Sequence, residues 1–136
     1  MNTDQISGAR RLVVIPFFAT VPLNATRVYR SLRISSPFLT REFSVSFALN
    51  TNRTLRVSFY ISPDEQTPDF APSGFSVFST LGQVDYVTGD DERKVLRHES
   101  FISESGMFLK VLARNTDGVV HTLDAQITIE LFPRGI

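Results

Sequence analysis

The chain has 136 residues, no cysteine, and equal numbers of basic and acidic side chains, 14 of each. This length fits one domain that folds without a covalent staple, and the absence of cysteine excludes disulfide bonds and thiolate metal sites. The zero net charge argues against a general nucleic-acid binder, and the longest apolar run, Leu12 to Ala19, is shorter than the roughly 20 residues that span a membrane. We therefore expect neither a specific nucleic acid nor a membrane as partner.

The charges are unevenly distributed along the chain. Residues 1–62 hold eight arginines and two acids, a net charge of +6, and residues 63–136 hold six basic and twelve acidic residues, a net charge of −6. If the halves stay apart on folding, the molecule has a basic and an acidic face that suit charged partners or copies of itself. If the halves interleave, this asymmetry disappears.

The N-terminal region divides into a polar arm, residues 1–11, and the start of a single domain, residues 12–136. Segment 10–20 is apolar on both faces, and Pro16 restricts it to a sheet edge or a bulge. One interpretation is a strand that lies between two sheets or changes sheets at Pro16. The other is an edge strand whose outer face a second subunit covers. The interface candidates are Arg10, Arg11, Val14, Pro16, Phe17 and Phe18.

Period-two alternation of apolar and polar residues dominates the rest of the chain and predicts half-buried β-strands. It is weak over 26–34, where Val28, Leu32 and Ile34 face one way. It is clear over 42–49, 55–61 and 123–131 and less clean over 107–113, and further strands are expected near 75–80, 83–88 and 93–101. Turn residues at 50–53 and 115–118 predict hairpins, and 89–92 predicts another turn. About eight short strands without a helix longer than one turn predict an all-β antiparallel sandwich, Greek-key or jelly-roll-like.

Residues 62–74 form a long loop with three prolines, Pro63, Pro68 and Pro72. Connections in compact domains are usually about four to six residues long, so a loop of this length requires an explanation. Phe70 either anchors the loop on its own domain or contacts a partner.

No residue pattern points to catalysis. His98 and His121 lack metal-ligand spacing, and no nucleophile elbow or glycine-rich phosphate loop is present. The acidic clusters at 64–69 and 90–92 offer oxygen ligands but lack the EF-hand pattern. We therefore predict no catalytic residues, no metal ligands and no cofactor, and a protein that is not an enzyme.

A second candidate surface combines arginine with tyrosine. Arg27, Tyr29 and Arg33 are predicted to share one strand face, and Arg56 and Tyr60 another. Such faces can bind sugars, phosphates or proteins, and they are also common as ordinary exposed strand faces. A carbohydrate-binding or adhesive module is therefore the alternative function, although tryptophan, the usual sugar platform, is absent.

The segment from Phe108 to Asn115, the turn Thr116-Asp117-Gly118 and the alternating strand to Phe132 resemble the closing hairpin of small all-β virion-surface proteins of tailed bacteriophages, the capsid decoration or cement proteins. The resemblance covers about 30 residues by pattern. It implies a non-enzymatic virion protein, made in the host cytoplasm, that bridges the major capsid protein or other virion proteins. It also implies a homo-oligomer, commonly a trimer, with the polar arm draped over a neighbour.

Overall fold

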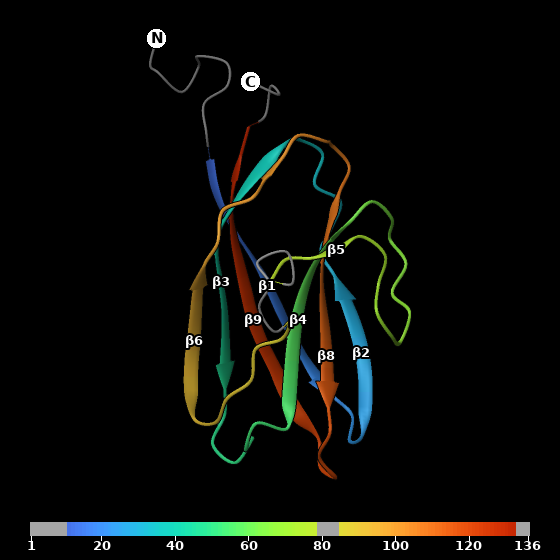
Figure 1. Ribbon diagram of the computed structural model, residues 1–136, viewed down its shortest axis with the longest axis vertical. Coiled ribbons are helices and arrows are strands. Elements are labelled where there is room, and N and C mark those ends of the chain that lie inside the picture. Colours follow the sequence, from blue (N-terminus) through green and yellow to red (C-terminus); the bar gives the residue numbers. More distant parts are fainter. Residues whose placement is uncertain (1–10, 79–84, 133–136) are drawn as a thin grey trace.

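The computed structural model describes residues 11–78 and 85–132, which form a sandwich of two antiparallel sheets (Figure 1). No helix occurs in these ranges, so they hold none that is long and apolar enough to cross a membrane. The strands are β1 (Arg11–Val21), β2 (Ala25–Arg30), β3 (Phe38–Phe47), β4 (Leu55–Ser62), β5 (Phe75–Ser76), β6 (Glu92–Arg97), β7 (Phe101–Ile102), β8 (Phe108–Asn115) and β9 (His121–Leu131).

The strand order is that of a jelly roll. Sheet A has the order β1-β9-β3-β6, with β7 paired to β3, and sheet B has the order β2-β8-β4-β5. Successive strands from β1 to β4 alternate between the sheets, and β8 and β9 lie in opposite sheets beside β2 and β1. Two four-stranded sheets wound in this way define the eight-stranded jelly roll, and β7 is a short addition. The predicted fold class is confirmed.

The two predicted hairpins are wrong. Residues 50–53 carry the chain from β3 in sheet A to β4 in sheet B, and residues 115–118 carry it from β8 in sheet B to β9 in sheet A. Asn50, Asn52 and Arg53 have the positive φ angles of a sharp turn. Such turns reverse the chain equally well within a sheet or between sheets, and alternation does not identify a strand's neighbour. The same correction applies to the closing hairpin on which the phage resemblance rested.

The inward residues of the strongly alternating segments are buried as predicted. Three phenylalanines join the two layers: Phe43 of β3 lies 5.1 Å from Phe59 of β4 and 5.4 Å from Phe78, measured between ring centroids. Two apolar side chains predicted to face inward are instead exposed: Leu32, at 85%, follows β2, and Leu49, at 65%, lies beyond the end of β3.

The outward face of sheet B differs from the prediction. Ser58, Tyr60 and Lys110 were expected to face water, but their relative exposures are 5%, 8% and 0%. The loop that follows β4 folds back over this face, where Asp64 of the loop pairs with Lys110 of β8. Gly74 closes the loop with a φ of +94°, where an added Cβ would lie only 2.1 Å from the carbonyl oxygen of Ile61, so the turn requires glycine.

The two oppositely charged halves of the chain interleave. In both sheets, strands from residues 1–62 alternate with strands from residues 63–136. The alternation brings Arg41 of β3 within 3.5 Å of Glu130 of β9, and Arg97 of β6 within 3.7 Å of Glu42 of β3. The charge asymmetry of the sequence therefore does not become one basic and one acidic sheet.

Candidate interaction surface

Strand β1 forms one edge of sheet A. It pairs along its whole length with β9, from Arg11 opposite Leu131 to Val21 opposite His121, and no other described strand pairs with it. The chain neither lies between the sheets nor changes sheet at Pro16, so the first interpretation of segment 10–20 is wrong. An edge position suits Pro16, which has no backbone N–H to give to a second neighbour.

The outward side of β1 is apolar and exposed. We call Leu12, Val14, Pro16 and Phe18 the β1 apolar row. Leu12, Val14 and Phe18 have relative exposures of 65%, 52% and 75%, and Pro16 is also exposed. Exposed edge strands with such side chains are common sites of association between chains.

Three other interface candidates, Phe17, Arg11 and Arg10, do not belong to the β1 apolar row. Phe17 is 5% exposed and belongs to the core, so it offers no surface in the folded chain. Arg11, predicted to end the polar arm, is the exposed first residue of β1, and Arg10 lies outside the described residues.

Phe70 does not anchor its loop, because its side chain is 70% exposed. The anchor is instead polar. Nζ of Lys110, on β8, donates to Oδ1 of Asp64 at 2.9 Å, and the hydroxyl of Ser73 donates to Oδ2 of Asp64 at 2.5 Å. Phe70 therefore remains accessible to a partner.

The hydrogen bonds from Ser73 and Lys110 hold the pKa of Asp64 at about 2, below its ordinary value of 3.8. The backbone N–H of Gln66 adds a third bond to the carboxylate. Sequence reasoning missed this pair because Lys110 lies at an outward position of β8, where a lysine is ordinarily solvated. No local pattern indicates that a loop 46 residues earlier in the chain covers it.

A groove with a volume of about 1020 Å³ opens between the edges of the two sheets. Its walls are β1 of sheet A and, from sheet B, the end of β2 with the connection that follows it. Apolar side chains that include Val13, Ile15 and Ile129 line it, as do Arg11, Arg30 and Arg33. The groove was not predicted, because it depends on which two strands form the sandwich edges.

The predicted arginine–tyrosine faces are not one surface. The register places Tyr29 on the inward side of β2 beside Val111, and its hydroxyl lies 3.5 Å from the carbonyl oxygen of Thr20 on β1. Tyr60 lies on the outward side of sheet B but is only 8% exposed. Burial raises the pKa of both tyrosines. The buried ring of Tyr60 has no open face for a sugar to stack on, whereas Tyr29 is half-buried and lines the groove.

The three arginines of these faces are dispersed as well. Arg27 lies 4.0 Å from Asp69 of the β4–β5 loop, Arg33 follows the end of β2 and lines the groove, and Arg56 lies over the ring of Tyr86, 4.8 Å from its centroid.

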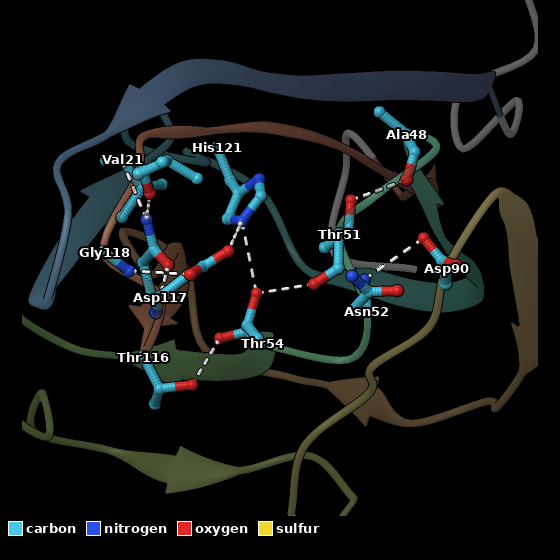
Figure 2. A network of polar contacts seen from close by, with 12 residues as sticks. Val21, Ala48, Thr51, Asn52, Thr54, Asp90, Thr116, Asp117, Gly118 and His121 are labelled. Carbon is cyan, nitrogen blue, oxygen red and sulfur yellow. Dashed lines mark hydrogen bonds and ion pairs between the residues drawn. The ribbon is translucent and has the colours of Figure 1, made fainter.

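A polar network occupies the end of the sandwich where several connections meet (Figure 2). Figure 2 shows Thr54 and Asp117 both facing the ring of His121, with Nε2 at 3.2 Å from the Thr54 hydroxyl and 2.9 Å from Oδ2 of Asp117. A hydroxyl–imidazole–carboxylate relay uses the two different ring nitrogens, whereas here one nitrogen contacts both groups. The Thr54 hydroxyl also donates to the carbonyl oxygen of Thr51 at 2.5 Å. These hydrogen bonds hold neighbouring turns together, and their arrangement does not activate the Thr54 hydroxyl as a nucleophile.

Asn115 connects two further turns from a buried position, with 1% exposure. Its Nδ2 donates to the carbonyl oxygens of Val21, Pro22 and Val119 at 3.3, 3.1 and 2.8 Å. Its Oδ1 accepts the N–H of Asp117 at 2.9 Å. One side chain therefore fixes the β1–β2 connection against the β8–β9 connection.

The ring of His98 lies 6.5 Å from the rings of Phe43 and Phe78, measured between centroids. Nε2 of His98 lies 3.1 Å from the hydroxyl of Ser100, which is a local contact. Among residues 11–78 and 85–132, no three His, Asp or Glu side chains lie together as potential metal ligands.

No family model and no curated protein matches the sequence. Among solved structures, a chain of infectious bursal disease virus, Gt strain, is similar over 93% of this chain, with a TM-score of 0.50 and 10% identity. A chain of broad bean stain virus (TM-score 0.47, 8% identity) covers 88% of this chain, and one of the capsid of Helicobacter pylori bacteriophage KHP30 (0.48, 12%) covers 92%.

This chain spans 33% of the infectious bursal disease virus chain, 85% of the broad bean stain virus chain and 94% of the KHP30 chain. At 10% identity, the similarity to the infectious bursal disease virus chain shows the fold alone. The structure is thus a jelly-roll sandwich with an exposed edge strand.

Proposed function

We propose that the chain is a non-enzymatic structural protein of a virus particle, and that it acts as a decoration protein bridging neighbouring subunits of the shell. The observation that carries the proposal is the β1 apolar row, an exposed apolar strip on the edge strand of a jelly roll. Monomeric proteins cover or charge such edges, so an uncovered one indicates a partner. Jelly rolls are common in viral capsids, and the structures with this fold include virus particles.

The proposed contact surface extends beyond β1. Phe70 on the β4–β5 loop is a second exposed aromatic side chain, and Arg11 adds a charge at the beginning of β1. Engaging several shell subunits at once raises the effective concentration of each contact, so individually weak contacts suffice. A protein that binds only the assembled shell stabilises it by linkage. Self-association as a trimer is part of the proposal.

The test uses particles of the virus that encodes the chain. We expect mass spectrometry to find the chain in purified particles, and particles assembled without it to form but to disassemble at a lower temperature. Its absence from the particles would overturn the proposal. Failure of any shell to form without it would make it a shell subunit and overturn the decoration role.

Variants locate the contact. The double substitution V14D/F18D charges the β1 apolar row, and we expect it to abolish co-sedimentation with particles that lack the chain. Leu49→Asp is the matched control, because Leu49 is equally apolar and 65% exposed but lies in the β3–β4 turn. Equal binding by both variants would show that the row is not the contact. Analytical ultracentrifugation of the chain alone tests the trimer, with an expected mass of three times 15.3 kDa.

A further inference from the structure

The groove between β1 and β2 has a distinctive charge. Three arginines line it, Arg11, Arg30 and Arg33, and among the described residues its lining contains no aspartate or glutamate. None of the three forms an ion pair with another described side chain. Arg30 instead lies 5.4 Å from the centroid of the Phe108 ring and donates to the carbonyl oxygen of Ser31 at 3.2 Å. The groove therefore attracts an anionic occupant.

The inner part of the groove is apolar. Val13 and Ile15 of β1 and Leu131 of β9 are only partly buried there, and Tyr29 closes the opposite side. These side chains pack against the core and still have a face toward the groove. An occupant that combines apolar groups with negative charge fits both parts of the lining.

The groove also follows the free edge of β1. Because β9 is the only described strand that pairs with β1, the backbone groups along the other edge of Arg11–Pro16 are available to a further strand. A strand rises about 3.3 Å per residue, so this stretch matches roughly six residues of a partner. Alternate side chains of an added strand point to opposite sides: one set enters the groove, where Arg11 lies on the same side of β1 as Val13 and Ile15, and the other set lies beside the β1 apolar row.

We propose that this groove is a docking site for an extended peptide segment of another protein, which adds a strand to β1 and carries carboxylates that pair with Arg11, Arg30 and Arg33. A fatty acid would match the charge and the apolar interior but could not pair with the strand edge, so the edge favours the peptide. The groove shares Val14 and Pro16 with the β1 apolar row, but peptide binding is measured on the isolated chain, so its failure and the failure of the virion role are distinguishable.

The test measures fluorescence anisotropy of the isolated chain with labelled peptides of ten residues. The probes are a set in which valine or isoleucine alternates with glutamate, and the control set has lysine in place of glutamate. We expect the acidic peptides to bind at least about tenfold more tightly than the lysine peptides, with an affinity that falls as salt rises. Absence of this preference would overturn the proposal.

A comparison of two charge-reversal variants tests where the peptide binds. R30E/R33E should weaken acidic-peptide binding by about tenfold or more, whereas R53E/R114E, the same charge change on exposed residues outside this groove, should change it by less than about twofold. Melting temperature and circular dichroism establish that both variants fold. Equal losses in the two variants would mean that binding is only a response to net charge.

N-methylation of alternate peptide bonds removes the N–H groups that pair with a strand edge. Methylation on the side that faces β1 should abolish binding, and unchanged binding would overturn the added strand. Oleate is measured in parallel. Binding of oleate without binding of any acidic peptide would overturn the proposal and assign the groove to an anionic amphiphile.

Discussion

Phe17 and Phe18 are adjacent in β1 but have opposite environments, with exposures of 5% and 75%. Replacing Phe17 by alanine removes a buried ring and leaves a cavity, so we expect the free energy of unfolding to fall by about 3–5 kcal/mol. Replacing Phe18 by alanine should change it by no more than about 0.5 kcal/mol, because the ring has few contacts to lose. Urea denaturation of the two variants measures both values. Similar losses would contradict the orientation of β1.

Asp64 and Lys110 form a pair in which the lysine is fully buried. We expect Asp64→Ala to lower the melting temperature, because it leaves the ammonium group without its carboxylate. Adding Lys110→Met should restore much of the loss, since an apolar side chain of similar length needs no partner. No recovery in the double variant would mean that Asp64 acts through Ser73 and the loop backbone instead.

The same pair predicts a pH dependence. The pKa of Asp64 is about 2 in the folded chain and 3.8 ordinarily, so the folded state favours the carboxylate. Its contribution to stability is therefore fully present above about pH 4 and is lost as the pH falls toward 2. The difference in urea midpoint between the wild-type chain and Asp64→Ala should shrink across that interval. A constant difference would exclude the ionised form of Asp64 as the stabilising species.

At the scale of strands and turns, Asn115 couples two connections that cross between the sheets. Asn115→Ala removes its buried donors from three carbonyl oxygens, and we expect a loss of about 1–3 kcal/mol in the free energy of unfolding. Thr116→Ala, which removes an exposed bond to the carbonyl oxygen of Thr54 in the same turn, is the control and should cost less. Equal losses in urea denaturation would mean that burial of Asn115 is not the cause.

The sequence predicted the strands better than their pairing. Alternation identified the inward residues of β3, β4, β8 and β9 because the period of a strand reports one buried face. It failed at 50–53 and 115–118 because a reversal within a sheet and a crossing between sheets use similar residues. It also failed for Lys110, since its burial depends on a distant loop.

The candidate interaction surface was likewise only partly predictable from the sequence. The apolar character of segment 10–20 and the requirement for an edge at Pro16 were readable from the sequence. Whether a given side chain of that strand faces the core or the solvent was not, because both faces are apolar and the alternation gives no signal there. The groove beside β1 depends on the complete strand order, which no local pattern contains.

At the scale of the whole molecule, neither half of the chain contains a complete sheet. Residues 1–62 supply β1 to β4, which are not neighbours of one another in either sheet, and residues 63–136 supply the strands between and beside them. A fragment ending at Ser62 therefore has no described strand pairs of its own. We expect fragments 1–62 and 63–136 to be unfolded separately and to regain β-sheet circular dichroism when they are mixed.

Charge should control the rate of that reassembly. The fragments carry net charges of +6 and −6, so their encounter is electrostatically steered and should slow as salt screens the attraction. Stopped-flow mixing at about 0.05 and 0.5 M salt measures the association rate, with a fall of about tenfold or more expected. The final signal should change little, because the folded state buries apolar side chains that salt does not screen. A fragment that folds by itself would contradict the interleaved strand order, and a rate independent of salt would show that docking of the strands, not encounter, limits assembly.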